Sequence, residues 1–224
     1  MPRATAAAAA ETARIVLATA TDLFGASGYA EVSLEDVAAA AGVTRGAVYH
    51  HYGTKLGLFR AVAAGLQAEV ADAVAAAADA AGAHRATDAS ARSDLSGGAD
   101  VSGRADASGG LAAMSLAFEE LRAGSHAFLD AITAAPVARV LLVDAPAVIG
   151  WTEWRELDAA NSARHLREAL ASVGAPEDLL DALTAQLSGA MNEAALRLAA
   201  HPADAPARAA AHRTLDRLLE AAIA

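Results

Sequence analysis

The chain has 224 residues, a formal net charge of −10 and no cysteine, and 55% of its residues are hydrophobic. This length can hold one small and one mid-sized domain, whereas the lack of cysteine excludes a disulfide framework and thiolate chemistry. Alanine dominates the composition, which favours an all-helical protein with closely packed helix axes. We find no convincing signal peptide and no uninterrupted apolar run of membrane-spanning length, so we expect a cytoplasmic protein without a membrane partner.

The first part of the chain predicts an arm followed by one helix. Residues 1–10 are expected to form a flexible arm, because the first residues of a domain are commonly disordered. A helix is predicted over about residues 12–27, where Val16 and Phe24 fall on one side. Gly28 follows this helix and is expected to end it.

A helix-turn-helix pattern follows the first helix and runs into a further helix. Ser33 precedes an apolar run and Asp36 stands three residues later, which is a variant of the capping box that starts a helix. Gly42 stands where the chain leaves that helix and needs a positive φ. Val43 then fills the corner, and Thr44 caps the second helix. These residues in this order predict two helices that cross at close range.

The outward residues of the second helix suggest a surface for DNA. In a helix-turn-helix protein, the N-terminal residues of the second helix face base edges in the major groove. Arg45 can offer two donors to guanine, and Gly46 removes bulk so that the backbone can come close. Three capped helix N-termini offer N–H groups to phosphate. Lys55, the only lysine in the chain, stands beside the last of them.

The pattern from Ile15 to Lys55 resembles the DNA-binding domain of the tetracycline-repressor (TetR) family over about residues 11–60. The resemblance implies homodimeric, all-helical repressors whose C-terminal domain binds a small molecule that releases DNA. Carried over by position, it implies phosphate contacts at Ser33, Thr44, Tyr49, His50, His51 and Lys55. It implies base contacts at Arg45, Gly46 and Tyr49.

Two departures from the family pattern and the distribution of charge bear on this expectation. Tyr52 stands where a phenylalanine is usual, and Leu56-Gly57 replaces the acidic residues often found after the lysine. The start of that helix is therefore expected to be less well supported. Residues 1–65 contain five of the 17 basic and five of the 27 acidic residues, so the whole net charge of −10 lies in the remainder. The acidity is expected to limit indiscriminate binding more than it blocks docking on DNA.

The rest of the chain predicts a long helix, an insertion and a helical C-terminal part. Apolar residues at helical spacing predict a helix over residues 54–81. Residues 82–110 are dominated by Gly, Ser, Asp and Ala, and are expected to form a flexible insertion. Helical periodicity then returns over about residues 111–132, 137–143, 151–173, 177–200 and 204–223.

We therefore predict an all-α fold with an N-terminal three-helix DNA-binding domain. A long helix joins it to a C-terminal helical domain for ligand binding and dimerisation. The expected boundaries are 1–10 for the arm, 11–60 for the helix-turn-helix domain and 61–224 for the C-terminal domain. Within that domain, residues 176–223 form the expected dimerisation helices, because their alanine-rich faces exceed what one monomer must bury. The alternative is that these faces only reflect the composition.

The stretch that contains both tryptophans is the leading candidate for an effector pocket. Trp151 and Trp154 stand beside a proline-broken helix and can line an apolar pocket, with Asp144 or Arg155 supplying polarity. The alternative is that both tryptophans are plain core. Met114, Phe118 and Phe128 are further candidates, for which core packing is again the alternative. Asn192 can contact a polar ligand or make a hydrogen bond at an interface.

We expect neither an enzyme nor a metal or cofactor site. His50 and His51 diverge on a helix and have no ligand partner at three or four residues' distance. The sequence has no Gly-x-Ser-x-Gly elbow, no zinc-protease motif and no cysteine nucleophile. The leading hypothesis is a repressor that binds a palindromic operator as a homodimer and is released by a small apolar effector. The alternatives are a dimeric DNA-binding protein without an effector and a helical enzyme with a vestigial head.

Overall fold

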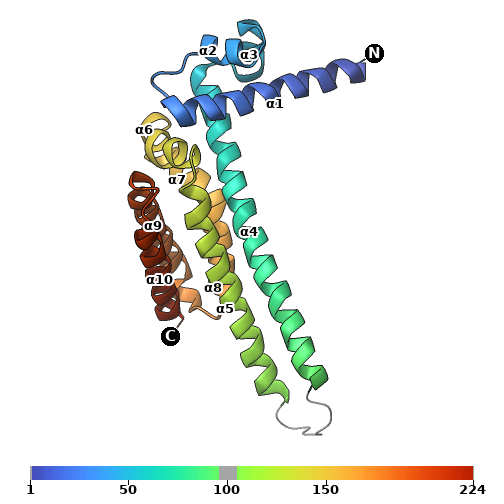
Figure 1. Ribbon diagram of the computed structural model, residues 1–224, viewed down its shortest axis with the longest axis vertical. Helices are drawn as coiled ribbons and strands as arrows, with labels where there is room; N and C mark the ends of the chain where they lie inside the picture. Colours follow the sequence, from blue (N-terminus) through green and yellow to red (C-terminus); the bar gives the residue numbers. More distant parts are fainter. Residues whose placement is uncertain (1, 96–104, 224) are drawn as a thin grey trace. The chain divides into compact units, whose positions relative to one another are not determined.

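The computed structural model describes residues 2–95 and 105–223, and every regular element in this part is helical (Figure 1). The predicted all-α fold class is therefore confirmed. In chain order the elements are α1 (Pro2–Ser27), α2 (Leu34–Ala40), α3 (Arg45–Tyr52), α4 (Lys55–Leu95), α5 (Ala105–Ile132), the π-helix η1 (Arg139–Asp144), α6 (Ala145–Val148), α7 (Trp151–Ala160), α8 (Ser162–Ser172), the short 3-10 helix η2 (Glu177–Leu179), α9 (Leu180–Ala200) and α10 (Ala205–Ala222).

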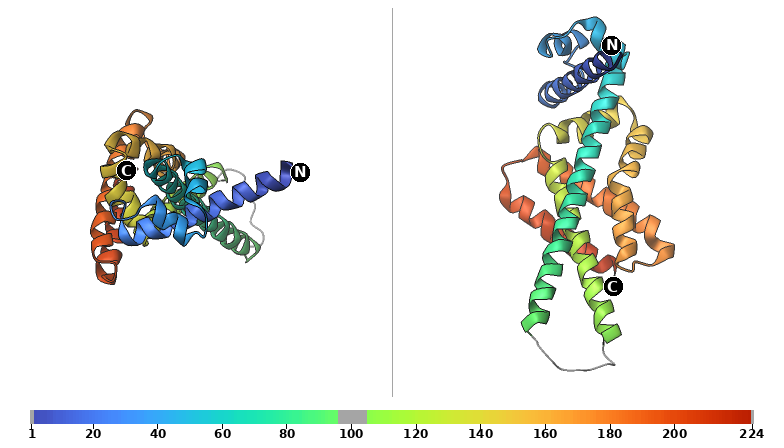
Figure 2. Two further views of the ribbon diagram at one scale, coloured as in Figure 1. Left: turned by 90° about the horizontal axis from the view of Figure 1, so that it is seen from above. Right: turned by 90° about the vertical axis from the view of Figure 1, so that its right-hand side faces the viewer.

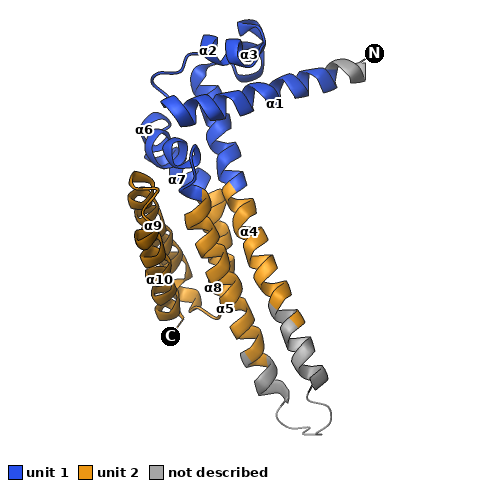
Figure 3. Ribbon diagram, viewed as in Figure 1, with its two compact units in different colours: residues 1–69, 132–158 blue, residues 70–131, 159–224 orange. Residues whose placement is uncertain are grey.

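The chain divides into two compact units (Figure 3). The first unit comprises residues 1–69 and 132–158, and the second comprises residues 70–131 and 159–224. The sequence pattern predicts a domain boundary near residue 60, with all later residues in one C-terminal domain. The first unit is larger than the predicted N-terminal domain, because residues 132–158 pack with the N-terminal helices.

An aromatic cluster forms the centre of the N-terminal helices. The side chains of Phe24 on α1 and Phe59 on α4 are fully buried, and their rings meet edge to face with centroids 5.3 Å apart. The ring of Tyr29 lies 4.9 Å from that of Phe59. Val16 and Val48 add fully buried apolar side chains from α1 and α3. The apolar positions that the helical periodicity identified in α1 thus form part of the core.

Helices α1 and α4 are longer than the sequence analysis predicted. Helix α1 begins at Pro2 instead of near residue 12, so it includes residues of the segment that was expected to form a flexible arm. A run of alanines at 6–10 explains the difference, because alanine has the highest helix propensity. Proline in the first turn is tolerated, since its missing N–H has no intrahelical partner there.

Helix α4 continues through Gly82 to Leu95, although the sequence placed its end near residue 81. One glycine inside a helix costs only about 1 kcal/mol relative to alanine. A Cβ atom at Gly82 would lie 2.4 Å from a carboxylate oxygen at the flexible end of the Glu120 side chain on α5, which would have to move. Residues 105–110 of the expected insertion belong to α5, and residues 96–104 lie outside the described part.

The contacts that join residues 132–158 to the N-terminal helices of the first unit include the following four. A Cβ atom at Gly25 would lie 1.7 Å from the Cβ of Pro136, so only glycine permits this approach. The guanidinium of Arg139 donates to the carbonyl of Ser27 at 3.1 Å. The carboxylate of Asp144 accepts the backbone N–H of Tyr29 at 2.8 Å. The remaining contact is the ion pair of Arg60 with Glu153, in which two guanidinium nitrogens donate at 2.6 and 2.7 Å.

The helices of the C-terminal half change at two points. Pro146 stands in the first turn of α6, directly after the π-helix η1. The helix predicted over 151–173 is divided into α7 and α8 by Asn161. The backbone of Asn161 has φ −119° and ψ −99°, which lies outside the helical region.

The second unit is a set of packed helices. Its core consists of apolar side chains spaced by three or four residues on each helix, which is why the periodicity located these helices. Helices α4 and α5 pass each other in Figure 1 and in the right-hand view of Figure 2, and Gly124 lets α5 approach Val74. The buried apolar side chains of this unit include those of Val70, Leu121, Phe128, Leu129, Leu166, Leu170, Leu180, Leu187, Met191, Leu198, Leu215 and Leu219.

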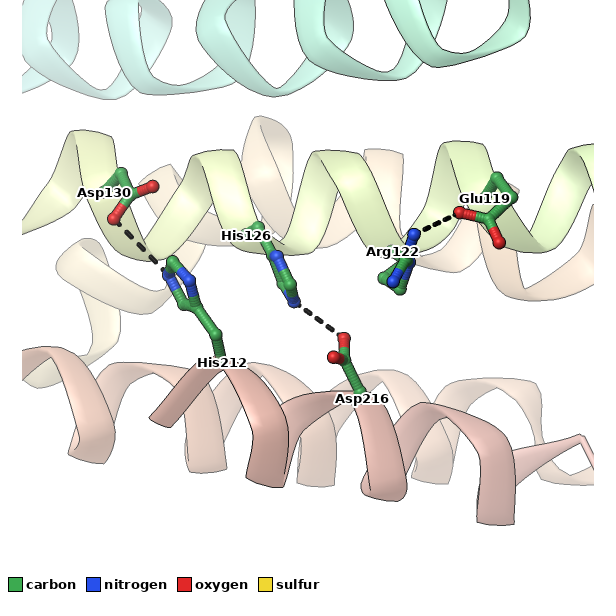
Figure 4. A network of polar contacts seen from close by, with 6 residues as sticks. All are labelled: Glu119, Arg122, His126, Asp130, His212 and Asp216. Carbon is green, nitrogen blue, oxygen red and sulfur yellow. Dashed lines mark hydrogen bonds and ion pairs between the residues drawn. The ribbon is translucent and has the colours of Figure 1, made fainter. Parts of the chain in front are cut away.

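A polar cluster joins α5 to α10 within the second unit (Figure 4). The rings of His126 and His212 stack with centroids 4.3 Å apart. His126 Nε2 lies 2.7 Å from a carboxylate oxygen of Asp216, and His212 Nε2 lies 3.4 Å from a carboxylate oxygen of Asp130, which also accepts from Arg208. Burial and the neighbouring His126 lower the pKa of His212 below its ordinary value, against the opposing effect of the two carboxylates.

Acidification is expected to destabilise the protein through His212. The unfolded chain takes up this proton near pH 6.5, whereas the folded chain takes it up only at lower pH. The folded state therefore binds fewer protons in this window, and the free energy of unfolding falls as the pH falls through it. Urea unfolding at pH values of about 7.5 and about 5.5 measures the effect, and His212→Gln should reduce it. An equal pH-dependent loss in the variant would contradict the assignment to His212.

One helical stretch is more apolar than the sequence analysis recognised. Residues 55–84 of α4 contain a window with a mean hydropathy of 1.3, which is long and apolar enough for a membrane span by composition alone. The many alanines raise the mean hydropathy, although an alanine side chain is small and only weakly hydrophobic. Leu58, Val62 and Leu66 from this stretch are buried in the first unit, so core packing accounts for its most apolar residues.

Candidate nucleic-acid interface

The capping box predicted at the start of α2 is present. Ser33 Oγ accepts the backbone N–H of Asp36 at 3.1 Å, and the Asp36 carboxylate accepts the backbone N–H of Ser33 at 2.8 Å. The Ser33 hydroxyl also donates to the Asp36 carboxylate at 2.6 Å. The two hydrogen bonds that the Asp36 carboxylate accepts lower the pKa of Asp36, and the bond from the Ser33 hydroxyl has the larger effect. The cap fixes where α2 begins and thus where the helix-turn-helix stands in the chain.

The turn between α2 and α3 has the geometry that its residues predicted. Gly42 has φ +66°, which an L-residue with a Cβ rarely adopts. The backbone N–H of Val43 donates to the carbonyl of Ala38 at 3.0 Å and closes the turn. Ala38 is buried beneath it, where a larger side chain would separate the helices.

Helix α3 presents one polar face outward. Thr44 Oγ1 accepts the backbone N–H of Ala47 at 3.2 Å and caps the helix, while Val48 is fully buried on the inner side. Among the residues predicted to contact DNA, Thr44, Arg45, Gly46, Tyr49 and His50 are exposed, and His51 is half-buried. The exposed residues occupy the first two turns of the helix, as base recognition requires.

Gly46 has no structural reason to be a glycine within the chain. A Cβ atom there would meet only Thr44 Oγ1, at the ordinary contact distance of 3.8 Å. The space above it is open. A requirement for glycine would therefore come from a molecule outside the chain, which fits the predicted close approach of a DNA backbone.

The guanidinium of Arg45 lies between two neighbours on this surface. Its Nη1 lies 2.5 Å from a carboxylate oxygen of Glu35, and its Nη2 donates to the Tyr49 hydroxyl at 3.1 Å. The guanidinium carbon lies 5.1 Å from the centroid of the Tyr49 ring. The hydrogen bond to Tyr49 and the charge of Glu35 raise the pKa of Arg45, which stays cationic.

The start of α4 supplies the third capped N-terminus. Thr54 Oγ1 accepts the backbone N–H of Gly57 at 2.9 Å, so the cap forms without an acidic residue in the first turn. A Cβ atom at Gly57 would lie 2.2 Å from the Tyr52 carbonyl oxygen, which explains the glycine that departs from the family pattern. Lys55 Nζ donates to the carbonyl of Ala30 at 3.2 Å and lies 4.4 Å from the centre of the Tyr29 ring.

The tyrosine that replaces the usual phenylalanine also has a structural role. The Tyr52 hydroxyl donates to the carbonyl of Ala13 at 2.7 Å, which ties the end of α3 to α1. Burial raises the pKa of Tyr52, so this hydroxyl keeps its proton at neutral pH. Sequence reasoning missed this contact, because the two residues lie 39 positions apart.

The candidates for effector binding in the first unit have other partners. The indole N–H of the buried Trp154 donates to the carbonyl of Leu141 at 2.8 Å, whereas Trp151 is 64% exposed. Asp144, predicted to supply polarity to a pocket, accepts the N–H of Tyr29. No local pattern predicts this contact, because the two residues lie 115 positions apart.

The remaining candidates lie in the second unit. Phe128 is buried, Phe118 is half-buried and Met114 is 48% exposed. Asn192 on α9 is only 7% exposed, and within the described part neither polar atom of its side-chain amide has a hydrogen-bond partner. A buried amide without partners is unfavourable. Asn192 is therefore the candidate with the strongest physical reason to meet a polar group from outside the chain.

The capped α2, the glycine turn and the exposed face of α3 define a helix-turn-helix protein of the transcriptional-regulator class. Residues 16–62 match the family described as bacterial regulatory proteins, tetR family, and residues 118–222 match the tetracyclin repressor-like C-terminal domain. The chain belongs to the TetR family of transcriptional regulators. The resemblance inferred from residues 11–60 is confirmed.

Similar proteins support the same family. The chain is 45% identical over 67 residues to the HTH-type transcriptional regulator SrpR of Pseudomonas putida, and 42% identical over 60 residues to the HTH-type transcriptional repressor BepR of Brucella suis. These matches cover 30% and 27% of this chain, and only 32% and 29% of the two relatives. A crystal structure of a TetR-family regulator from Pectobacterium atrosepticum is 27% identical, covers 96% of each chain and has a TM-score of 0.65.

Proposed function

We propose that this protein is a sequence-specific DNA-binding repressor that binds a palindromic operator as a homodimer. The exposed face of α3 carries the proposal, because Arg45, Gly46 and Tyr49 occupy its first two turns above the fully buried Val48. In this arrangement the helix can enter the major groove without losing its own core contacts. Relatives named as HTH-type regulators and a repressor support it.

We assign phosphate contacts to residues around this face. Ser33, Thr44, Tyr49, His50, His51 and Lys55 are the proposed set. Ser33 and Thr44 already cap helices with their hydroxyls, so the adjoining helix N-termini offer backbone N–H groups to phosphate. Lys55 supplies a cation whose point charge carries little sequence information.

Lys55→Ala should weaken binding to all duplexes alike. Removing one phosphate contact lowers affinity independently of sequence and reduces the salt slope by about 1 per subunit. Fluorescence anisotropy at several salt concentrations, on one specific and one unrelated duplex, measures both quantities. A loss confined to the specific duplex would contradict the phosphate role of Lys55.

Homodimerisation is proposed to occur through residues 176–223. Leu196 on α9 and Leu218 on α10 are 40% and 42% exposed, which leaves large apolar side chains for a second copy. A single helix-turn-helix gives little affinity, whereas a dimer reads two half-sites about one or more helical turns apart.

A small apolar effector is proposed to release the operator. We assign its recognition to residues of the second unit, namely Asn192, Phe128, Phe118 and Met114. Asp144, Trp151 and Trp154 in the first unit are separate candidates. An effector acts by binding more tightly to the form that does not fit DNA. The alternative is an effector-independent protein whose C-terminal half only dimerises. Thermal shift against a panel of hydrophobic metabolites separates these, because a ligand of the folded state raises the melting temperature by mass action.

Selection of bound sequences from random DNA tests the proposed function. Purified wild-type protein should enrich a two-fold symmetric sequence, since two copies of α3 read two half-sites. Enrichment of no sequence at moderate ionic strength, where sequence-independent electrostatic binding is weakened, would overturn the proposal.

A further inference from the structure

Glu35 and Asp36 are adjacent acidic residues in the first turn of α2, but they have different partners. Asp36 completes the capping box with Ser33. Glu35 takes no part in that cap and instead lies 2.5 Å from Arg45, across the turn on α3. The helix start is therefore complete without Glu35, and its contact with Arg45 calls for a separate explanation.

The two contacts of Arg45 leave part of its guanidinium available. Glu35 meets Nη1 and Tyr49 accepts from Nη2. An arginine side chain carries about five N–H groups in a planar fork, so further N–H groups remain for acceptors on a base edge. The side chains of Arg45 and Glu35 are 58% and 50% exposed, so DNA can reach this pair.

We propose that Glu35 is a positioning residue that determines sequence specificity. Its carboxylate orients the Arg45 guanidinium toward a base edge, and its negative charge weakens the attraction of Arg45 for phosphate. The inference rests on the proposed DNA-binding function. On the correct sequence, Arg45 keeps Glu35 and binds the two acceptors of guanine with a side chain that is already ordered. Less conformational freedom is then lost on binding. On other sequences, the paired arginine gains little binding energy from a phosphate group, because the nearby Glu35 carboxylate repels the phosphate.

The proposal predicts effects of opposite sign on two kinds of DNA. Glu35→Gln should weaken binding to the duplex selected by the wild type by about two- to fivefold, because Arg45 loses its positioning partner. The same variant should bind a random-sequence duplex as well as the wild type or better, because a negative charge has been removed near the backbone. The ratio of the two affinities should therefore fall.

Glu31→Gln is the matched control. Glu31 is exposed in the same N-terminal part and has the same charge, but no contact joins it to Arg45 in the described structure. It should shift both affinities in the same direction and preserve their ratio. In an Arg45→Ala background, Glu35→Gln should behave like Glu31→Gln, since the positioned group is gone. Circular dichroism melting of each variant verifies that the head is folded.

Fluorescence anisotropy on the two duplexes measures the ratio of the two affinities for each variant and so tests the positioning role of Glu35. A ratio that falls with Glu35→Gln and stays constant with Glu31→Gln supports the positioning role. Equal changes of the ratio in both variants, or an unchanged effect of Glu35→Gln in the Arg45→Ala background, would overturn it while leaving the proposed function intact. A wild type that binds neither duplex would overturn the proposed function and this inference with it.

Discussion

Phe59→Ala is expected to lower the free energy of unfolding by about 3–5 kcal/mol. The Phe59 side chain is fully buried, and its ring contacts those of Phe24 and Tyr29. Truncation removes these contacts and leaves a cavity where α1 and α4 meet. Because a domain of this kind is stable by only about 5–15 kcal/mol, the loss is a large fraction of the total. DNA binding should fall with it, since α3 is held by the same core.

Urea unfolding followed by circular dichroism measures this loss. Phe59→Leu retains most of the apolar volume and is expected to cost clearly less than the alanine variant. Val143→Ala alters a side chain that is 57% exposed and should change stability by less than about 0.5 kcal/mol. If the Phe59→Ala protein were as stable as the Val143→Ala protein, the aromatic cluster would not be what stabilises the packing of the N-terminal helices.

Arg45→Ala is expected to cost about 1–3 kcal/mol of binding to the specific duplex. Arginine is the residue on α3 that can donate two parallel hydrogen bonds to guanine, and alanine can donate none. The loss should appear as relaxed preference at one position of each half-site, with the rest of the sequence still recognised.

Selection from random DNA, run in parallel on wild type and Arg45→Ala, measures this preference. The control is Lys55→Ala, which should lower affinity without changing the selected sequence. If Arg45→Ala protein selects the same sequence as wild type at every position, Arg45 does not read a base and the assignment of α3 as the reading helix loses its main support.

Features that depend on neighbouring residues were predictable from the sequence. The Ser33 cap, the positive φ of Gly42 and the Thr44 cap each involve contacts within a few positions, and all three are present. The buried side chains of α1 followed from the helical period. The outward residues of α3 then followed from the inward position of Val48, because a helix has a fixed angular spacing.

Features that depend on distant contacts or on small differences in propensity were not predictable. The bond between Asp144 and Tyr29 and the close approach of Gly25 to Pro136 join residues more than a hundred positions apart. The pairing of Glu35 with Arg45 required the crossing of α2 and α3 to be known. Helix α4 continues through Gly82 because the high helix propensity of the alanines on both sides exceeds the cost of one glycine. A rule that ends every helix at a glycine does not include this comparison.

Sedimentation of the purified protein with and without DNA tests the central proposal most directly. We expect two chains per particle in solution, and two chains on one symmetric duplex at low ionic strength, because two copies of α3 must enter the groove together. A protein that remained a single chain and bound no duplex offered at low salt would contradict both the dimer and the DNA-reading role of α3.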